Sequence, residues 1–250
     1  MSAADLTTFG LGLAVVVATT VVVARWARVG LGWVPVTSIL RATVQLGVVA
    51  LLLQGVLARE GTVVLFLLLM ASTASLTAAG RLRELWHGRR AAVAGVVSGA
   101  AVALGLVLAL RLVELDARYV VAVAGIVIGN AMSAATLSGR TFLRSVRRRR
   151  DEVEGWLALG ATPAVAHREI GREAVREALL PNLDQARSTG LVTLPGAFVG
   201  ALFGGASPVE AARFQLVVLA GVALAMVVCG VVVTRLLGRT PYVVADESGD

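Results

Sequence analysis

The sequence lacks residue types on which whole classes of function depend. It contains no lysine, so all 23 basic residues are arginines. A phosphate-loop ATPase needs a lysine that reaches the β- and γ-phosphates, so this class is excluded and any work with ATP must fall to a partner. One cysteine, Cys229, and two histidines, His87 and His167, cannot by themselves make a disulfide framework or a zinc site. We therefore expect no metal centre and no cofactor bound to this chain.

Charge is also scarce. Only 16% of the 250 residues are charged, 57% are hydrophobic, and the mean hydropathy is +0.83. A soluble domain has about 25% charged residues, so this chain has too little polar surface to enclose a water-soluble core. The composition predicts an all-α, polytopic membrane helix bundle, organised as one transmembrane domain over residues 1–250 with a polar tail at 240–250.

Seven apolar stretches are long enough to cross the roughly 30 Å hydrocarbon layer as helices. We place them at about Thr7 to Ala24, Val34 to Ala58, Thr62 to Ala79, Ala91 to Leu110, Tyr119 to Ser138, Ser188 to Ala206 and Arg213 to Leu237.

The arginines predict how these spans are oriented, because short cytoplasmic loops collect basic residues. With the N-terminus outside and the C-terminus cytoplasmic, the inner segments hold 18 arginines and the outer segments hold four. The first stretch follows Asp5 and precedes Arg25 and Arg28, the reverse of a signal peptide, so we expect a retained helix. If the sixth stretch does not cross the membrane, six spans remain, and Arg235 and Arg239 lie outside.

Polar side chains within the spans are candidates for a substrate pathway. Arg41 and Gln45 share one face of the second span, where they either line a pathway or, for Arg41, anchor the helix at the headgroups. Asn130, Met132 and Ser133 form a cluster in the fifth span that either contacts substrate or holds helices together.

Asp184 lies at the inner end of the sixth span. Its carboxylate either receives a cation from the cytoplasm or pairs with an arginine such as Arg187.

Glycines recur at four-residue spacing and allow helices to approach closely. The repeats are Gly95-Gly99, Gly125-Gly129 and Gly196-Gly200-Gly204. They serve packing within one chain or, with the triple repeat as the best candidate, a dimer face. Pro195-Gly196 predicts a bend or hinge in the sixth span.

The segment from residue 139 to 187 is the longest inner loop and predicts a helix-turn-helix element. A basic helix from Arg140 to Leu159 leads to Gly160, after which Thr162 caps a second helix that begins at Pro163 and ends near Leu180. Such an element either docks a partner or folds back on its own bundle. Nucleic-acid binding is a poor explanation for its arginines, which lie near anionic headgroups.

The stretch EGWLALGATP at 154–163 resembles the cytoplasmic EAA loop of ABC transporter permeases, although Gly155 and Trp156 replace the two usual alanines and Leu180-Pro181 comes late. Five further stretches resemble the FetB family of iron-export ABC permeases, to which plant aluminium-sensitivity proteins also belong. These are LRATVQL at 40–46, NAMSAA at 130–135, LLPNLD at 179–184, STGLVTLPG at 188–196 and GASPVEAARFQ at 205–215. The resemblance covers about residues 38 to 237.

This resemblance implies a half-transporter in the cell membrane, in which two copies of the permease work with two separate ATP-binding subunits and move substrate outward. The coupling residues would be Glu154, Gly160, Ala161, Thr162 and Pro163. Iron follows from the resemblance alone, and another metal, a metal conjugate or a nucleotide sugar stays open as substrate. The rival interpretations are a channel or scaffold without an ATPase, and an intramembrane enzyme, which the absence of a nucleophile paired with a base argues against.

Overall fold

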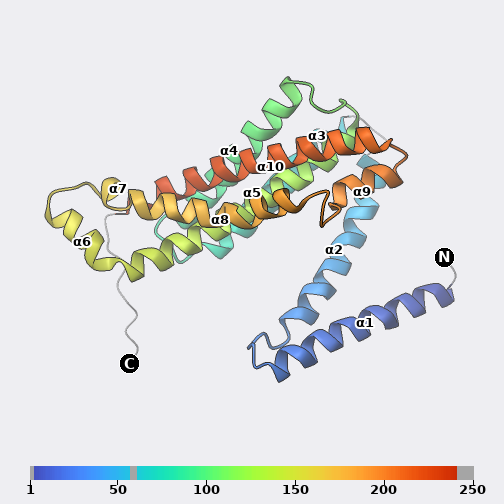
Figure 1. Ribbon diagram of the computed structural model, residues 1–250, viewed down its shortest axis with the longest axis horizontal. Coiled ribbons are helices and arrows are strands. Elements are labelled where there is room, and N and C mark those ends of the chain that lie inside the picture. The colour runs from blue at the N-terminus through green and yellow to red at the C-terminus, as the bar shows by residue number, and fades with distance from the viewer. Residues whose placement is uncertain (1–2, 57–60, 241–250) are drawn as a thin grey trace. The chain divides into compact units, whose positions relative to one another are not determined.

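The computed structural model describes residues 3–56 and 61–240, and within them the chain is helical, apart from loops and one isolated bridge between Thr189 and Thr193 (Figure 1). The predicted all-α membrane architecture is confirmed. The end of the second span at Ala58, the outer Arg59 and the polar tail beyond residue 240 lie outside the described residues. The chain divides into two compact units, residues 1–60 and 61–250.

The first unit is a pair of helices, α1 (Ala3–Trp26) and α2 (Val34–Val56). The connection between them turns at Arg28, Gly30 and Gly32, all of which have positive φ. The Arg25 guanidinium lies 4.8 Å from the centre of the Trp33 ring and closes the hairpin by a cation–π contact. Both helices are as apolar as the sequence predicts, and each is long enough to cross a membrane.

The second unit is built on α3 (Thr62–Arg81), α4 (Gly88–Ala109), α5 (Ala117–Arg148) and α10 (Pro208–Leu237). Its core is dominated by alanine and valine, because the helices pack at short distance. A Cβ atom on Gly95 would lie 2.5 Å from Cγ2 of Val233, and one on Gly99 would lie 2.5 Å from the carbonyl oxygen of Ala225. The Gly95-Gly99 repeat therefore packs α4 against α10 within one chain.

Six of the described helices are long and apolar enough to cross a membrane, namely α1, α2, α3, α4, α5 and α10. They match six of the predicted stretches. The fifth is longer than predicted, because α5 runs through Gly139 to Arg148. A Cβ on Gly139 would lie 2.6 Å from Cδ1 of Leu82. This glycine therefore makes room for a buried leucine instead of ending the helix.

The sixth predicted span is not one long helix, and this part of the prediction is wrong. The segment holds the end of α8 at Ser188, a non-helical turn, and the eight-residue helix α9 (Gly196–Phe203). Gly190 has φ +87°, and its N–H donates to the carbonyl oxygen of Thr193 at 2.9 Å. Pro195 lies in an extended conformation just before α9, so Pro195-Gly196 begins a helix and does not bend one.

The chain nevertheless passes from one end of the second unit to the other through α8 and α9 together. A cavity of about 800 Å³ brings the α9–α10 connection, Gly204 to Ala206, against the α4–α5 connection, Arg111 to Leu115. At the other end, Leu237 and Thr240 share a smaller cavity with Glu84 to Trp86, which join α3 to α4. Within this unit α5 and α10 therefore run in the same direction, and α8 and α9 return the chain between them.

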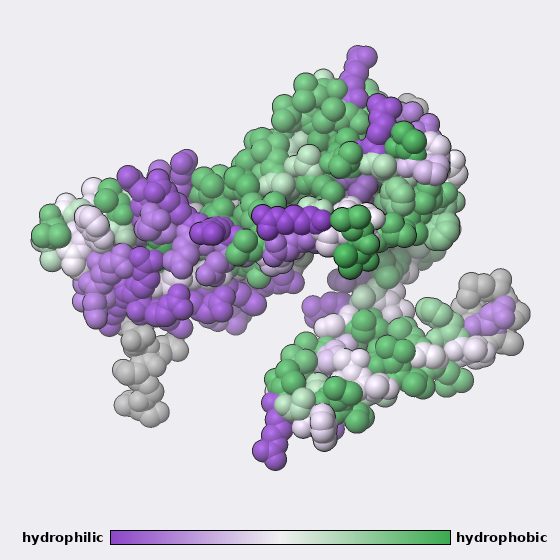
Figure 2. All heavy atoms as spheres, in the orientation of Figure 1, coloured by the Kyte–Doolittle hydropathy of each residue, from purple (hydrophilic) through white to green (hydrophobic). Residues whose placement is uncertain are grey.

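Hydrophilic side chains gather at the end of the second unit that carries α6, α7 and the C-terminal end of α10 (Figure 2). We call it the basic end. Which end faces the cytoplasm stays a prediction.

Candidate functional site

The predicted helix-turn-helix lies at the basic end and consists of α6 (Arg150–Ala158), α7 (Pro163–Ala166) and α8 (Arg168–Ser188). Its helices differ from the prediction in two ways. The basic helix expected from Arg140 to Leu159 is interrupted at Arg149, and its first part belongs to α5. The second helix is interrupted at His167 and continues through Pro181 to Ser188.

The turn after α6 is closed by its own backbone. Gly160 has φ +85° and donates to the Leu157 carbonyl oxygen at 3.0 Å, while the N–H of Ala161 donates to the Trp156 carbonyl oxygen at 3.0 Å. This pair of hydrogen bonds is the Schellman arrangement, which favours glycine because of the positive φ. The predicted roles of Gly160 as helix terminator and Pro163 as first helical residue are confirmed. Thr162 precedes α7 in an extended conformation, but its hydroxyl makes no capping hydrogen bond.

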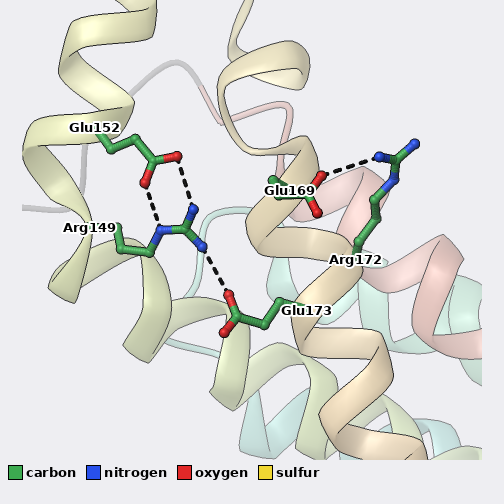
Figure 3. Close-up of polar contacts among 5 residues, drawn as sticks. All are labelled: Arg149, Glu152, Glu169, Arg172 and Glu173. Carbon is green, nitrogen blue, oxygen red and sulfur yellow. Dashed lines mark hydrogen bonds and ion pairs between the residues drawn. The ribbon is translucent and has the colours of Figure 1, made fainter.

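Arg149 connects the start of α6 to α8 (Figure 3). Its guanidinium binds both carboxylate oxygens of Glu152, at 2.7 and 2.9 Å, and one oxygen of Glu173 at 2.9 Å. A bidentate arginine–carboxylate pair fixes direction as well as distance. A charged contact that spans 24 residues of sequence therefore holds the start of α6 against α8.

These contacts also shift two pKa values. Hydrogen bonds and charge from Arg149 lower the pKa of Glu152, and the same carboxylate, followed by Glu173, raises the pKa of Arg149. Both shifts favour the charged pair.

One face of the element is buried and the other is exposed. Val153 of α6, Ala166 of α7 and Ile170 of α8 are at most 5% exposed and pack into the core. The exposed apolar residues of the element include Leu159, which is 84% exposed, with Trp156 on α6 and Val165 on α7. The element thus folds back on its own bundle and also presents an apolar outer surface.

The predicted coupling residues lie on or next to this outer surface. Glu154 is exposed and pairs with Arg150, whose Nε lies 2.7 Å from Oε1. Gly160 and Thr162 are exposed, and Ala161 and Pro163 are half-buried. Gly160 to Pro163 form the turn itself, and Glu154 lies earlier on α6.

Asn130, Met132 and Ser133 lie half-buried on α5. The side-chain amide of Asn130 donates to the Ile126 carbonyl oxygen at 2.8 Å, and the Ser133 hydroxyl donates to that of Gly129 at 3.1 Å. Both donors thus bond their own helix, and among the described residues neither bonds to another helix. Their predicted substrate role stays a prediction.

The remaining pathway candidates belong to other helices. Arg41 and Gln45 are exposed on α2, in the first unit. Asp184 is exposed on α8 and forms an ion pair with Arg187 at 3.2 Å, the structural role considered for it. Among the described residues, no group of three or more His, Cys, Asp and Glu side chains is placed to hold a metal.

The other glycine repeats differ in their surroundings. A Cβ on Gly125 would lie 3.1 Å from Cε of Met70, whereas Gly196 and Gly200 on α9 face no described atom within 4 Å. Pro195 and Gly196, predicted as a hinge, lie at the start of this open helix.

Two features were not foreseen from the sequence. Arg149 belongs to the basic helix predicted from Arg140 to Leu159, and its spacing of three residues from Glu152 is a recognisable helical pair. The bridge to Glu173 and the exposed apolar tip at Leu159 had no such local signal.

The fold and this element define a polytopic helical membrane protein with a folded helix-turn-helix at one end of its bundle. Comparison with known proteins is more specific. The chain matches the family described as "Uncharacterised protein family (UPF0014)" over residues 8–242, and it belongs to that family.

Three relatives illustrate the family. The chain is 36% identical to the UPF0014 membrane protein STAR2 of Oryza sativa subsp. japonica, over 82% of this chain and 72% of that protein. It is 34% identical to Protein ALUMINUM SENSITIVE 3 of Arabidopsis thaliana, over 73% of this chain and 67% of that protein. It is 30% identical to the Probable iron export permease protein FetB of Escherichia coli (strain K12), over 72% of this chain and 71% of that protein. The predicted resemblance to these proteins is confirmed. No solved structure matches the chain.

Proposed function

We propose that this chain is the membrane-spanning permease subunit of an ABC half-transporter in the cell membrane, which exports a metal ion from the cytoplasm. Two copies of the permease form the pathway, and a separate ATP-binding subunit binds ATP and docks at the basic end. Iron is the proposed substrate because the similar FetB protein is named as a probable iron export permease. The chain itself has no lysine for a phosphate loop, so it is not the ATPase and we assign it no enzymatic role.

The observation that carries this proposal is the tip of the helix-turn-helix element. Leu159 and Trp156 offer apolar surface of the kind that a partner groove buries. The Schellman turn at Gly160 holds them in one conformation, and Arg149 ties the helix behind them to α8. A docking element needs such rigidity, because a flexible turn would not transmit movement from the ATPase to the bundle.

The test reconstitutes the permease with its ATP-binding subunit in inverted vesicles and measures ATP-dependent uptake of labelled iron. Glu154→Ala combined with Gly160→Asp should reduce co-purification of the ATPase and uncouple ATP hydrolysis from transport. Glu177→Ala is the matched control, because Glu177 is exposed on α8 and is not one of the coupling residues.

The outcomes separate the rival functions. Unchanged ATPase binding and unchanged transport in the double variant would disprove the coupling assignment. Transport that needs no ATPase would instead identify a passive channel. ATP-dependent transport of another labelled metal or of a nucleotide sugar, without iron transport, would keep the permease and replace its substrate.

A further inference from the structure

A second concave site lies at the basic end, between α7–α8 and the C-terminal end of α10. It encloses about 630 Å³, and Ala164 of α7 and His167, which follows α7, are part of its lining. Arg168 and Arg172 line it from α8, and Arg235 and Arg239 line it from the end of α10. None of the coupling residues lines this cavity.

The described residues that line this cavity are basic or uncharged and include no carboxylate. Arg172 pairs with Glu169 at 3.2 Å, but both side chains are about two-thirds exposed, and such pairs contribute little. In the described part of the chain, no carboxylate lies within ion-pair distance of Arg168, Arg235 or Arg239. Among the described residues, the exposed Glu169 is the one carboxylate paired with an arginine of this lining, so the lining has a net positive charge.

His167 supplies the second observation. It lines the same cavity, is only 2% exposed, and stacks near Phe142 with ring centres 5.7 Å apart. Its Nδ1 lies 2.8 Å from the Pro163 carbonyl oxygen, so Nδ1 carries a proton and donates it. Its Nε2 is buried and has no hydrogen-bond partner among the described residues. A buried polar atom without a partner is costly, and a ligand that meets Nε2 removes this cost.

The floor of the cavity is apolar. An added Cβ on Gly171 would lie 3.3 Å from Cβ of Thr234, so α8 and α10 approach closely there. The Thr234 hydroxyl donates to the Gly230 carbonyl oxygen at 2.9 Å and does not compete for a ligand. Val175 and Val231 complete the floor. The cavity thus offers charged donors along its rim and a hydrocarbon surface beneath them.

We propose that this cavity binds a phosphate group, which the guanidinium groups of Arg168, Arg172, Arg235 and Arg239 hold and which His167 Nε2 contacts. Guanidinium forks match phosphate oxygens in charge and in geometry. Nε2 donates to a phosphate oxygen when the ring carries both protons, and accepts from a protonated phosphate oxygen when it carries one. The phosphate belongs either to an anionic phospholipid or to a soluble compound, and the experiment separates these sources. This site is independent of the proposed transport function.

The test uses the purified full-length chain in detergent, stripped of lipid. One arm titrates phosphatidylglycerol against phosphatidylcholine and counts bound lipid by native mass spectrometry. The other arm titrates inorganic pyrophosphate and follows the unfolding temperature. Arg168→Gln with Arg235→Gln should weaken binding at least about tenfold, because each removes a charge-assisted contact. Arg140→Gln with Arg148→Gln is the matched control, since both arginines are exposed on α5 and do not line the cavity.

Selective loss of phosphatidylglycerol from the cavity variant identifies a lipid site, and selective loss of the pyrophosphate response identifies a site for a soluble phosphate compound. Either result supports the proposal. Equal weakening in both double variants, or no binding of either probe to the unmodified chain, would overturn it. Arg239→Gln, which lies beyond the end of α10, should weaken binding in the same direction if the double variant does not fold.

Discussion

At the scale of single residues, Arg149 has the most specific role, because it joins two carboxylates from different helices. Its two hydrogen bonds to Glu152 fix the direction of the guanidinium group, and a third hydrogen bond reaches Glu173 on α8. Arg172 and Glu169, at 3.2 Å and largely exposed, form a comparison pair within one helix.

We expect the double-mutant cycle of Arg149→Gln and Glu173→Gln to give a coupling energy of roughly 0.5–1 kcal/mol. The measurement is amide hydrogen exchange over residues 150–158, which reports local opening of α6. The cycle of Arg172→Gln and Glu169→Gln should give a value close to zero at the same amides. Equal couplings in the two cycles would mean that the bridge to Glu173 does not hold α6.

The lowered pKa of Glu152 makes the attachment of α6 sensitive to acid. Its carboxylate binds Arg149 better in the folded element than in an open one, so its stabilising effect is complete above the ordinary glutamate pKa, about 4.3. The effect is lost as the pH falls through the lower pKa of the folded state. Exchange over residues 150–158, corrected for the intrinsic rate, should therefore accelerate below about pH 4 in the unmodified chain. Glu152→Gln should remove this step, and an unchanged step would assign it to another group.

At the scale of helices, the sequence predicts local features well and long-range ones poorly. The Gly160–Pro163 turn was predictable because a glycine with positive φ and a proline in a first turn act within a few residues. Gly139 looks equally like a helix end, but its role depends on Leu82, which comes from another helix. Pro195 indicates an irregularity between α8 and α9. The non-helical turn that begins at Thr189 depends on backbone hydrogen bonds that the composition does not reveal.

The close approach of α4 and α10 gives a stability prediction. Gly99→Ala places a methyl group 2.5 Å from the Ala225 carbonyl oxygen and 2.9 Å from Cβ of Cys229, so the helices must move apart. We expect a loss of about 1–3 kcal/mol, the usual cost of overpacking. Unfolding of the purified protein by a denaturing detergent measures it.

Gly105→Ala is the control for this substitution, since Gly105 lies on the same helix and no described atom lies within 4 Å of an added Cβ. It should be neutral or stabilise by up to about 1 kcal/mol, because alanine favours helix more than glycine does. A Gly99→Ala variant as stable as the Gly105→Ala variant would contradict the packing described for α4 and α10.

At the scale of the whole molecule, the orientation prediction can be tested with introduced cysteines. The native Cys229 is fully buried, so it should stay unlabelled by a membrane-impermeant maleimide. Leu115→Cys, in the connection between α4 and α5, should be labelled in intact cells, whereas Leu159→Cys should be labelled only in inverted vesicles. Both leucines are highly exposed in the structure, 67% and 84%. The reverse pattern would place the basic end outside and remove the coupling role from the helix-turn-helix.

The uninterrupted course of α5 has a mechanical consequence. Eighteen residues separate Asn130 from Arg148, which corresponds to about 27 Å of continuous helix. A helix without a proline or a bulge resists bending, so a displacement of one end of α5 moves its other end by nearly the same amount. If a force on the turn near Leu159 reached α5 through the start of α6, then Asn130, Met132 and Ser133 would move together as parts of one rigid helix.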